Sequence, residues 1–330
     1  MATKFSKSVS PQPLDQYGTT KISKKTVKQK QKSTKRGYGK KNKRKNKSKV
    51  INLSLLGTNA AGIKPKMESF YHTINKFRPS ICTVQETKMN KKGLVKLPGY
   101  QLFEKVRESK GGGGLLTCVD EDLNPVLISS CKDDTEILTV EANLGNNKIR
   151  IINAYGPQED DDIQDVLGFW QELEGEVIRA KDENCYIIIE MDANAKVGKK
   201  VIKEDQHNIS SNGKIMLDFV ERQGLIISNS MDICKGAVTR EREVQNKIER
   251  STIDYIITCE ELSKHITEVM IDEDRIHTYP DVSKTRLVIE LSRAITTFFL
   301  QISLLRLTEY LVKLGKSILG LNVVKVNNNF

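Results

Sequence analysis

The sequence predicts a mixed α/β (α+β) fold in which two β-sheets pack face to face as a sandwich and helices flank them. Two observations support this prediction. Short apolar runs typical of strands follow one another between residues 100 and 154, separated by Gly, Asn, Asp and Ser. Helical apolar patterns stand before and after that series, next to further strand-like runs. A chain of 330 residues can also bury a core that folds without disulfides or metals.

The elements expected in order begin with a β-α-β unit: a strand at 50–56, an amphipathic helix at 66–77 and a buried strand at 80–85. Strands are then expected at 100–106, 114–119, 124–129, 137–142 and 148–154. The remaining elements are helices at 163–179 and 214–223 and strands at 186–191, 224–228 and 252–258.

Positive charge is concentrated at the start of the chain. The first 50 residues hold 17 Lys and Arg and one acid, Asp15, whereas the rest holds 36 basic and 41 acidic residues. The formal net charge of +11 therefore describes the first segment and not the expected folded body. Residues 1–49 contain too few apolar side chains to offset the entropy of ordering, so we expect a disordered Lys-rich leader.

The basic side chains of this leader are densest at Lys40, Lys41, Lys43, Arg44 and Lys45. Three roles are open for such a cluster: a nuclear localisation signal, a nonspecific contact with nucleic-acid phosphates, or a solvated tail that keeps the protein soluble. The six cysteines are scattered without a C-x-x-C pair, which favours free thiols in a reducing compartment. The leader lacks the apolar region of a secretory signal, and no stretch reaches about 18 apolar residues. We expect an intracellular protein, nuclear or cytoplasmic, with no membrane partner.

The stretch at 186–194 is the most informative part of the sequence. An apolar strand there ends in Asp192-x-Asn194. Residues i and i+2 of an extended segment project to the same face, so this carboxylate and amide can align a water and hold a phosphate oxygen. The alternative interpretation is a strand end followed by an Asx turn.

Further polar residues follow other predicted strands, and they are Asn59, Glu86, Tyr155 and Asp254. Loops at the strand ends of a two-sheet sandwich can converge on one mouth, where sites are usually built. Each residue also has a structural explanation: Asn59 as a turn residue, Glu86 as a solvated carboxylate, Tyr155 as an amphipathic cap and Asp254 as a helix or turn partner.

Six short motifs occur in one order between residues 50 and 290. They are Gly-Thr-Asn-Ala-Ala-Gly at 57–62, Gln-Glu-Thr-Lys at 85–88, four glycines at 111–114, Tyr-Gly-Pro-Gln at 155–158, Asp-Ala-Asn at 192–194 and Ile-Asp-Tyr at 253–255. In this order the motifs resemble those of the endonuclease/exonuclease/phosphatase superfamily, and more closely the endonuclease domain of non-LTR retrotransposons. The resemblance implies a four-layer fold and metal-dependent hydrolysis of DNA phosphodiesters.

The resemblance also implies a role for each residue. Glu86, helped by Asn59, would hold Mg²⁺, with Mn²⁺ as an alternative, because a hard cation takes oxygen ligands. Asp192 would orient or deprotonate the attacking water. Asn194 and Tyr155 would bind the phosphate, and the metal would offset charge on the leaving oxygen.

One expected motif is missing. The family closes its site with Ser-Asp-His on the final strand, where Asp254 would ordinarily orient the histidine. None of the four histidines, at positions 72, 207, 265 and 277, follows an Asp, and each is expected in a helix or loop. At 288–298, where we expect the motif, the chain reads Val-Ile-Glu-Leu-Ser-Arg-Ala-Ile-Thr-Thr-Phe. A second departure is Glu190, where many relatives have Gly.

We hypothesise that the missing motif lies in another reading frame. Residues 293–298 can be encoded by AGA GCG ATC ACA ACA TTT, which from its third nucleotide spells Ser-Asp-His-Asn-Ile. Residues 291–330 would then be an out-of-frame, non-family extension, although degenerate codons also allow such a match by chance. Sequencing the coding DNA across residues 285–300 tests this.

Two functions remain open from the sequence. The first is a Mg²⁺-dependent DNA endonuclease of retrotransposon origin, impaired by the missing motif. The second is a catalytically inactive relic that still binds nucleic acid. Hydrolysis of phospholipids or inositol phosphates ranks lower, since the motifs match retroelement nucleases more closely. No Asp-Asp polymerase motif is found, so no reverse transcriptase is expected in this chain, and the oligomeric state is not indicated.

Overall fold

The structure is a computed structural model that describes residues 51–107, 112–131, 135–203, 205, 207–244, 246–272 and 284–291. The predictions for the leader at 1–49 lie outside the described residues. So do those for the extension, apart from residue 291.

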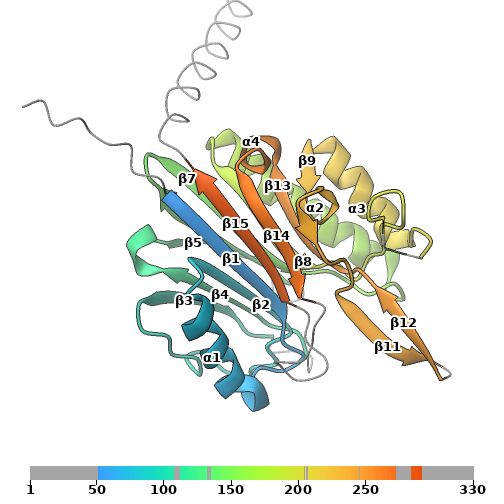
Figure 1. The fold of residues 1–330 in the computed structure, drawn as a ribbon, viewed down its shortest axis with the longest axis horizontal. Coiled ribbons are helices and arrows are strands. Elements are labelled where there is room, and N and C mark those ends of the chain that lie inside the picture. Colours follow the sequence, from blue (N-terminus) through green and yellow to red (C-terminus); the bar gives the residue numbers. More distant parts are fainter. Residues whose placement is uncertain are drawn as a thin grey trace, which may run out of the picture. The chain divides into compact units, whose positions relative to one another are not determined.

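The first sheet has seven strands among the described residues, in the order β10-β14-β15-β1-β2-β4-β3. Their bounds are β1 Ile51–Asn59, β2 Ile81–Gln85, β3 Tyr100–Lys105, β4 Leu115–Asp120, β10 Cys234–Lys235, β14 Ile266–Asp272 and β15 Lys284–Leu291. β1 runs parallel to β2 and antiparallel to β15 (Figure 1).

The second sheet has six strands in the described part of the chain, in the order β5-β6-β7-β8-β13-β9. Their bounds are β5 Val126–Ser130, β6 Ile137–Leu144, β7 Asn147–Tyr155, β8 Tyr186–Asp192, β9 Leu225–Ile227 and β13 Asp254–Cys259. β7 and β8 are parallel and are connected through a helix, whereas β13 is antiparallel to β8. A separate hairpin joins β11 Arg240–Val244 to β12 Lys247–Ser251.

Helices cover the outer faces of both sheets (Figure 1). Their bounds are α1 Met67–Phe77, α2 Ile163–Asp182, α3 Ser211–Arg222 and α4 Glu260–Ser263, with 3-10 turns η1 Lys64–Lys66, η2 Glu121–Leu123 and η3 Ser228–Ser230. Phe70 and Ile74 of α1 pack on the first sheet, and Leu173 and Val177 of α2 pack on the second. The layers are therefore helix, sheet, sheet and helix, which confirms the predicted fold class.

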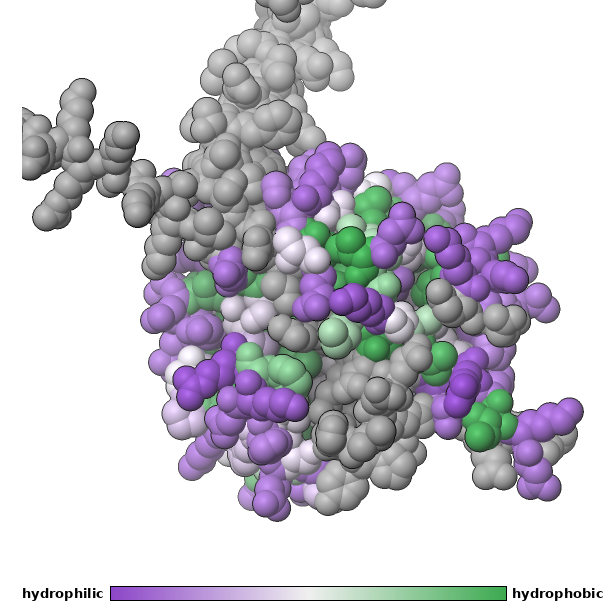
Figure 2. Space-filling view, viewed as in Figure 1, coloured by the Kyte–Doolittle hydropathy of each residue, from purple (hydrophilic) through white to green (hydrophobic). Residues whose placement is uncertain are grey.

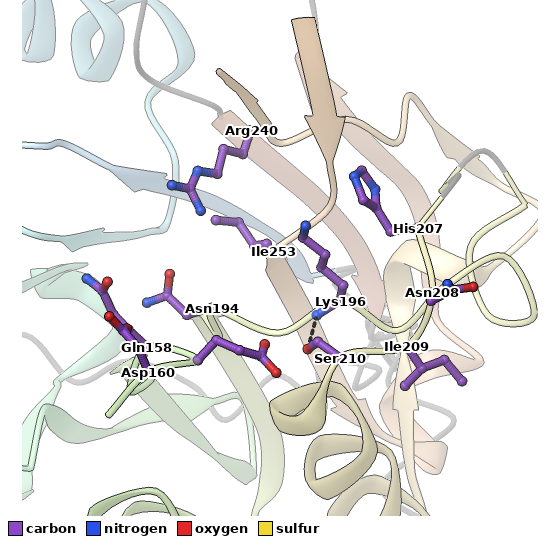
Figure 3. Close-up of a pocket in the computed structure, with 11 residues that line it drawn as sticks. Gln158, Asp160, Asn194, Lys196, His207, Asn208, Ile209, Ser210, Arg240 and Ile253 are labelled. Carbon is purple, nitrogen blue, oxygen red and sulfur yellow. Dashed lines mark hydrogen bonds between the residues drawn. The ribbon is translucent and has the colours of Figure 1, made fainter. Parts of the chain in front are cut away.

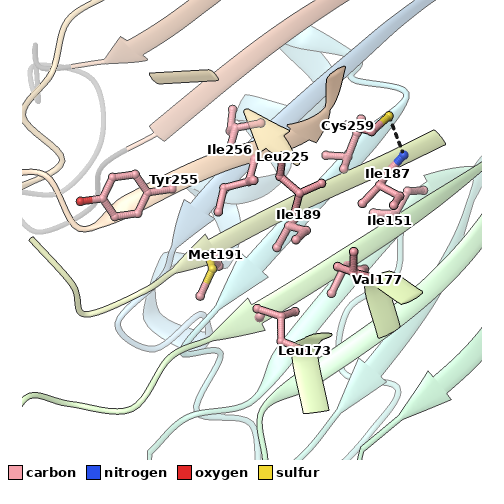
Figure 4. Packing of buried hydrophobic residues seen from close by; sticks show 14 of the residues in the cluster. Ile151, Leu173, Val177, Ile187, Ile189, Met191, Leu225, Tyr255, Ile256 and Cys259 are labelled. Atoms are coloured by element: carbon pink, nitrogen blue, oxygen red, sulfur yellow. Dashed lines mark hydrogen bonds between the residues drawn. The ribbon is translucent and has the colours of Figure 1, made fainter. Parts of the chain in front are cut away.

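The side chains of the central strand β8 alternate between its two faces, so the strand contacts a helix on one side and the first sheet on the other. Ile187, Ile189 and Met191 lie on the face that packs against Leu173 and Val177 of α2 (Figure 4). Residues at the alternate positions must point the other way, toward the first sheet. Asp192 ends this second series, so the strand places its last carboxylate between the two sheets.

A buried polar network joins the sheets below that carboxylate. Glu190 of β8 is 1% exposed and accepts hydrogen bonds from Thr83 Oγ1 at 2.8 Å and from Gln85 Nε2 of β2. Gln85 Nε2 also donates to Asn153 Oδ1 at 2.8 Å, and Asn153 donates to Leu116 O at 3.0 Å. The departure from the family pattern at Glu190 is thus accommodated by partners on the facing sheet, because buried polar groups need them.

Most strands expected from the sequence are present within a few residues, but five strands and one short helix were missed. The missed elements are β10, β11, β12, β14, β15 and α4, and α3 begins at Ser211 instead of 214. Ser210 caps that helix, since its Oγ accepts a hydrogen bond from Gly213 N at 3.1 Å. In Figure 2 the hairpin extends beyond the rest of the described surface and carries both hydrophilic and apolar side chains.

The predictions about cysteines and membranes can be compared directly with the structure. All six cysteines are free thiols, as expected. Within the described ranges, no helix combines the length and the apolar character needed to cross a membrane.

Candidate active site

Strand register brings the predicted site residues to one edge of the sandwich. In the second sheet Asp192 pairs with Tyr155 of β7 on one side and with Asp254 of β13 on the other. The three residues are therefore adjacent across three neighbouring strands. In the first sheet Asn59 of β1 pairs with Gln85 of β2, and Glu86 follows directly. Residues that are up to 195 positions apart in sequence, Asn59 and Asp254, therefore meet at the same edge.

The side-chain amide of Asn59 connects the two sheets at this edge. Its Nδ2 donates to Glu86 Oε1 at 2.9 Å and to Asp192 Oδ2 at 2.7 Å. Its Oδ1 accepts a hydrogen bond from Ala61 N at 2.9 Å, which sets the orientation of the amide. Two carboxylates thus converge on one neutral group.

Burial dominates the electrostatics of Asp192, which is 3% exposed. Burial raises its pKa to about 6, and the Glu86 carboxylate contributes to the rise. Hydrogen bonds from Asn194 N, at 3.0 Å, and from Asn59 oppose the rise without cancelling it. A carboxylate with a pKa of about 6 is largely ionised at neutral pH yet basic enough to accept a proton, which suits a general base.

The pKa of Glu86 is shifted in the opposite direction, downward. Burial raises its pKa, but hydrogen bonds from Asn59 and Lys88 outweigh burial, so the pKa is lower than that of an ordinary glutamate. The Lys88 ammonium lies 3.0 Å from Glu86 Oε2. The backbone of Glu86 is left-handed, with φ of 46°, a conformation that non-glycine residues rarely adopt without support.

The glycine turn before β4 supplies part of that support. Thr87 N donates to Gly114 O at 3.0 Å and Lys88 N donates to Gly113 O at 2.8 Å. Gly114 has φ of 89°, and a Cβ there would lie 2.6 Å from Thr87 Oγ1. Only glycine allows the turn to approach the loop that carries Glu86, which explains this motif of the sequence.

Tyr155 and Asn194 are the next two site residues. Tyr155 pairs with Asp192 in the neighbouring strand β7, and Asn194 follows the end of β8. The Tyr155 hydroxyl contacts the side chains of Glu86, Asn194 and Gln158. Burial raises the pKa of Tyr155 well above its usual range, with contributions from Glu86 and Asp192, so the phenol stays protonated and can donate. Asn194 Nδ2 donates to Gly156 O at 3.0 Å.

Gly156 allows the two loops to pack closely. Its N donates to Asp192 O at 2.7 Å, and a Cβ on Gly156 would lie 2.6 Å from Ala193 O. The Tyr-Gly-Pro-Gln and Asp-Ala-Asn motifs are therefore coupled by direct backbone contact.

Asp254 is also brought to the site, at the start of β13. It is 4% exposed, and its backbone is held by Thr239, whose Oγ1 accepts from Asp254 N at 3.1 Å, and by Asn229, whose Nδ2 donates to Asp254 O at 3.1 Å. As expected, the histidines of the described chain lie in a helix or loop: His72 in α1, and His207 and His265 in loops. His277 lies outside the described residues.

The register of β15 shows which of its ends lies at the site edge. We expected Ser-Asp-His at 288–298, but Leu291 of β15 pairs with Ile51, at the far end of β1 from the site. Lys284 pairs with Thr58, so β15 begins at the site edge and runs away from it. Residues 292–330 lie outside the described residues, so the frame hypothesis and the origin of this segment stay predictions.

A cavity of about 660 Å³ opens beside Asn194 (Figure 3). It is lined by Gln158, Glu159, Asp160, Asn194, Lys196, His207, Asn208, Ile209, Ser210, Arg240 and Ile253. Lys196 Nζ and His207 Nε2 both lie 3.1 Å from Glu249 Oε1 of β12, and His207 Nδ1 lies 3.0 Å from Asp205 Oδ1. Neither this cavity nor Arg240 was predicted from the sequence, because the cavity includes Arg240 of the unpredicted hairpin.

The donor set at the strand ends fits a hard divalent cation. Glu86 and Asp192 offer only oxygen ligands and converge on the side chain of Asn59. Asn59 turns its Nδ2 toward them, and its own ligand atom, Oδ1, accepts from Ala61 N. A second acidic group, Glu141 with Glu183 and Cys185, also brings ligand atoms within 4.8 Å of one another. There, however, Arg150 Nη2 lies 2.8 Å from Glu141 and 2.6 Å from Glu183, so the chain supplies its own cation.

Comparisons with known proteins agree with this architecture. A scan of protein-family models finds no match, and a search of curated proteins finds none either. Among solved structures, the endonuclease domain of TRAS1, a telomere-specific non-LTR retrotransposon, is 18% identical with a TM-score of 0.56, covering 72% of this chain and 98% of that one. The AP endonuclease LMAP from Leishmania major is 12% identical with a TM-score of 0.61, covering 73% and 88%.

The chain has the fold of these endonucleases. An AP endonuclease from Archaeoglobus fulgidus shares it too, at 15% identity and a TM-score of 0.56, covering 73% of this chain and 99% of that one. The expected endonuclease/exonuclease/phosphatase-like architecture is thus confirmed. Within this fold, Glu86 and Asp192 both accept hydrogen bonds from Asn59.

Proposed function

We propose that this protein is a divalent-metal-dependent DNA endonuclease of the kind that non-LTR retrotransposons encode. The observation that carries the proposal is the convergence of two carboxylates, the half-buried Glu86 and the buried Asp192, on the amide of Asn59, with Tyr155 and Asn194 beside them. The fold supports the proposal, because it is shared with solved endonucleases. The sequence motifs support the retrotransposon origin.

Glu86 and Asn59 would hold Mg²⁺, or Mn²⁺, through oxygen atoms. The low pKa of Glu86 keeps that carboxylate ionised at neutral pH, as a metal ligand must be. When bound, the metal neutralises charge on the phosphate and the leaving oxygen.

Asp192 would orient the attacking water and accept its proton while the water oxygen bonds to phosphorus and the bond from phosphorus to the leaving sugar oxygen breaks. Its raised pKa suits that role near neutral pH. The Tyr155 hydroxyl and the Asn194 amide would donate hydrogen bonds to phosphate oxygens. Asp254 would keep the orienting role that it has in the resembling family.

The remaining expectations belong to the same proposal. Lys40, Lys41, Lys43, Arg44 and Lys45 would add nonspecific contacts to DNA phosphates. The protein would act in the nucleus or the cytoplasm, and any retrotransposition would need a reverse transcriptase from another protein.

The alternative function is an inactive DNA-binding relic. It is favoured by the register of β15, whose first residues, Lys284 and Thr285, pair with Thr58 and Gly57 at the site edge. Preceded by Ser283, they read Ser-Lys-Thr where a closing Ser-Asp-His would stand. Losing a catalytic acid-base group commonly lowers the rate by about 10²-fold to 10⁴-fold.

A plasmid-nicking assay with purified full chain separates these functions. We expect nicking in Mg²⁺ and none in EDTA. Glu86→Ala and Asp192→Ala should each reduce the rate by about 10³-fold, because each removes charge from the reacting centre. Asp182→Ala removes an exposed carboxylate at the end of α2 and should leave the rate unchanged.

Equal background nicking in all four proteins would contradict the proposed endonuclease activity and favour the inactive DNA-binding relic. In that case the double variant Lys284→Asp with Thr285→His tests the cause. Nicking that appears only in this variant, and that Glu86→Ala abolishes again, would show that the incomplete edge explains the inactivity.

A further inference from the structure

Arg240 begins the hairpin strand β11 and lies at the margin of the candidate site. Its exposed side chain lines the same cavity as Asn194. In Figure 3 its guanidinium points toward the side of the cavity that carries Asn194 and Gln158. Those two side chains contact the Tyr155 hydroxyl, so Arg240 faces the group of donors assigned to the phosphate.

The backbone beside Arg240 is tied to the site. Thr239 N donates to Ser251 O at 3.1 Å. Thr239 Oγ1 accepts from Ile253 N at 2.9 Å and from Asp254 N at 3.1 Å. These bonds hold the first residues of β11 against the start of β13. They therefore fix the backbone position of Arg240 near Asp254.

The guanidinium of Arg240 forms no ion pair or hydrogen bond with a described residue. Two lysines beside the site, Lys88 and Lys196, are already paired with Glu86 and Glu249.

We propose that Arg240 is a phosphate-binding residue, and that its guanidinium donates to a non-bridging oxygen of the phosphodiester that is to be cleaved. This proposal rests on the proposed function and adds a residue to it. A guanidinium presents a planar fork that matches phosphate oxygens, and such charge-assisted hydrogen bonds are among the strongest in proteins. Two carboxylates lie at this edge and would repel a phosphate, so a cation on the chain would add to the attraction that a bound metal supplies.

The contacts of Glu249 explain how the hairpin holds Arg240 at the cavity. Glu249 of β12 contacts Lys196, two residues after Asn194, and also His207 of the cavity wall, each at 3.1 Å. These contacts join the hairpin to the loop that follows Asp192. Glu249 is therefore a positioning residue for Arg240.

Arg250 provides a matched control. It lies on the same hairpin, is 63% exposed, pairs with Glu241 at 3.1 Å and does not line the cavity. Arg240→Gln and Arg250→Gln each remove one positive charge from the hairpin. Only the first should affect the site.

The test measures two quantities in the full-length wild type, Arg240→Gln, Arg240→Lys and Arg250→Gln. The first is kcat/KM for Mg²⁺-dependent nicking. We expect Arg240→Gln to lower it by about 10-fold to 100-fold, Arg240→Lys to lower it less, and Arg250→Gln to leave it within about 3-fold. The second is the affinity for a 20-base-pair duplex in EDTA as a function of salt concentration.

In the binding measurement, the slope of log affinity against log salt should decrease by about 0.9 for Arg240→Gln, because one phosphate contact is lost. The leader is present in every variant, so its contribution cancels in the differences. Equal slopes for all four proteins, or equal decreases for both Gln variants, would overturn the proposal. Because this measurement needs no cleavage, it still decides the role of Arg240 if the wild type does not nick DNA.

Discussion

Two acidic groups lie near opposite ends of the neighbouring strands β7 and β8, and they differ in how their negative charge is compensated. At one end Glu141 and Glu183 surround Arg150, whose side chain is fully buried. At the other end Glu86 and Asp192 share only the neutral amide of Asn59. The first group is neutralised by the chain, whereas the second has one lysine, Lys88, on Glu86 alone.

This difference separates a structural cluster from a candidate site. A buried charge is tolerated when an opposite charge and hydrogen bonds compensate it, as around Arg150. No cation among the described residues pairs with the buried Asp192, and its pKa of about 6 records the free energy that the native state loses as the group ionises. Residues that are costly to fold in this way are expected at sites that bind a cation or a substrate.

The largest effect should come from breaking the compensated cluster. Arg150→Met leaves Glu141 11% exposed with Lys148 as its remaining partner, and should lower the free energy of unfolding by about 3 kcal/mol. Chemical denaturation measures this loss. Arg150→Met with Glu141→Gln should recover most of it, since no buried charge then remains. A double variant as unstable as the single one would mean that packing, and not charge, accounts for the loss.

At the other end, removing a charge should stabilise the protein. The pKa of Asp192 is raised from 3.8 to about 6, so the native state binds the proton more tightly and loses stability as the pH rises through this window. In EDTA, the stability advantage of Asp192→Asn over the wild type should be about 2 kcal/mol larger at pH 8 than at pH 4.5. An advantage that does not change with pH would show that Asp192 is not buried as described.

Part of this contrast could be predicted from the sequence and part could not. The apolar run before Asp192 predicted β8. The expectation that Asp192 and Asn194 share one strand face was wrong, because β8 ends at Asp192 and Asn194 has φ of 46°. Asn194 N donates to Asp192 Oδ1 at 3.0 Å, so the alternative, a strand end followed by an Asx turn, is the one observed. The motifs identified Asn59, Glu86 and Tyr155, which the strand register brings together. These successes rest on local patterns that strands display in their own sequence.

The missed features depend on distant partners. β11 and β12 read Arg-Glu-Arg-Glu-Val and Lys-Ile-Glu-Arg-Ser, with no apolar face to mark a strand. Without that hairpin, nothing in the sequence places Arg240 near Asp192. Arg150 was missed as well, because a lone arginine in a strand does not reveal that two acids distant in sequence surround it. The sequence also did not show that β15 begins at the site, since only pairing with β1 reveals where that strand begins.

The smallest effect, and the most direct comparison of the two acidic groups, is stabilisation by Mg²⁺. A cation that binds only the native state at ten times its Kd adds about 1.4 kcal/mol to the free energy of unfolding. We expect that gain in the wild type and in Glu183→Gln, because Arg150 already compensates the second group. Glu86→Gln should lose it. Denaturation curves at constant ionic strength measure the gain, and its loss in Glu183→Gln instead of Glu86→Gln would assign the cation to the Arg150 cluster and reverse the comparison.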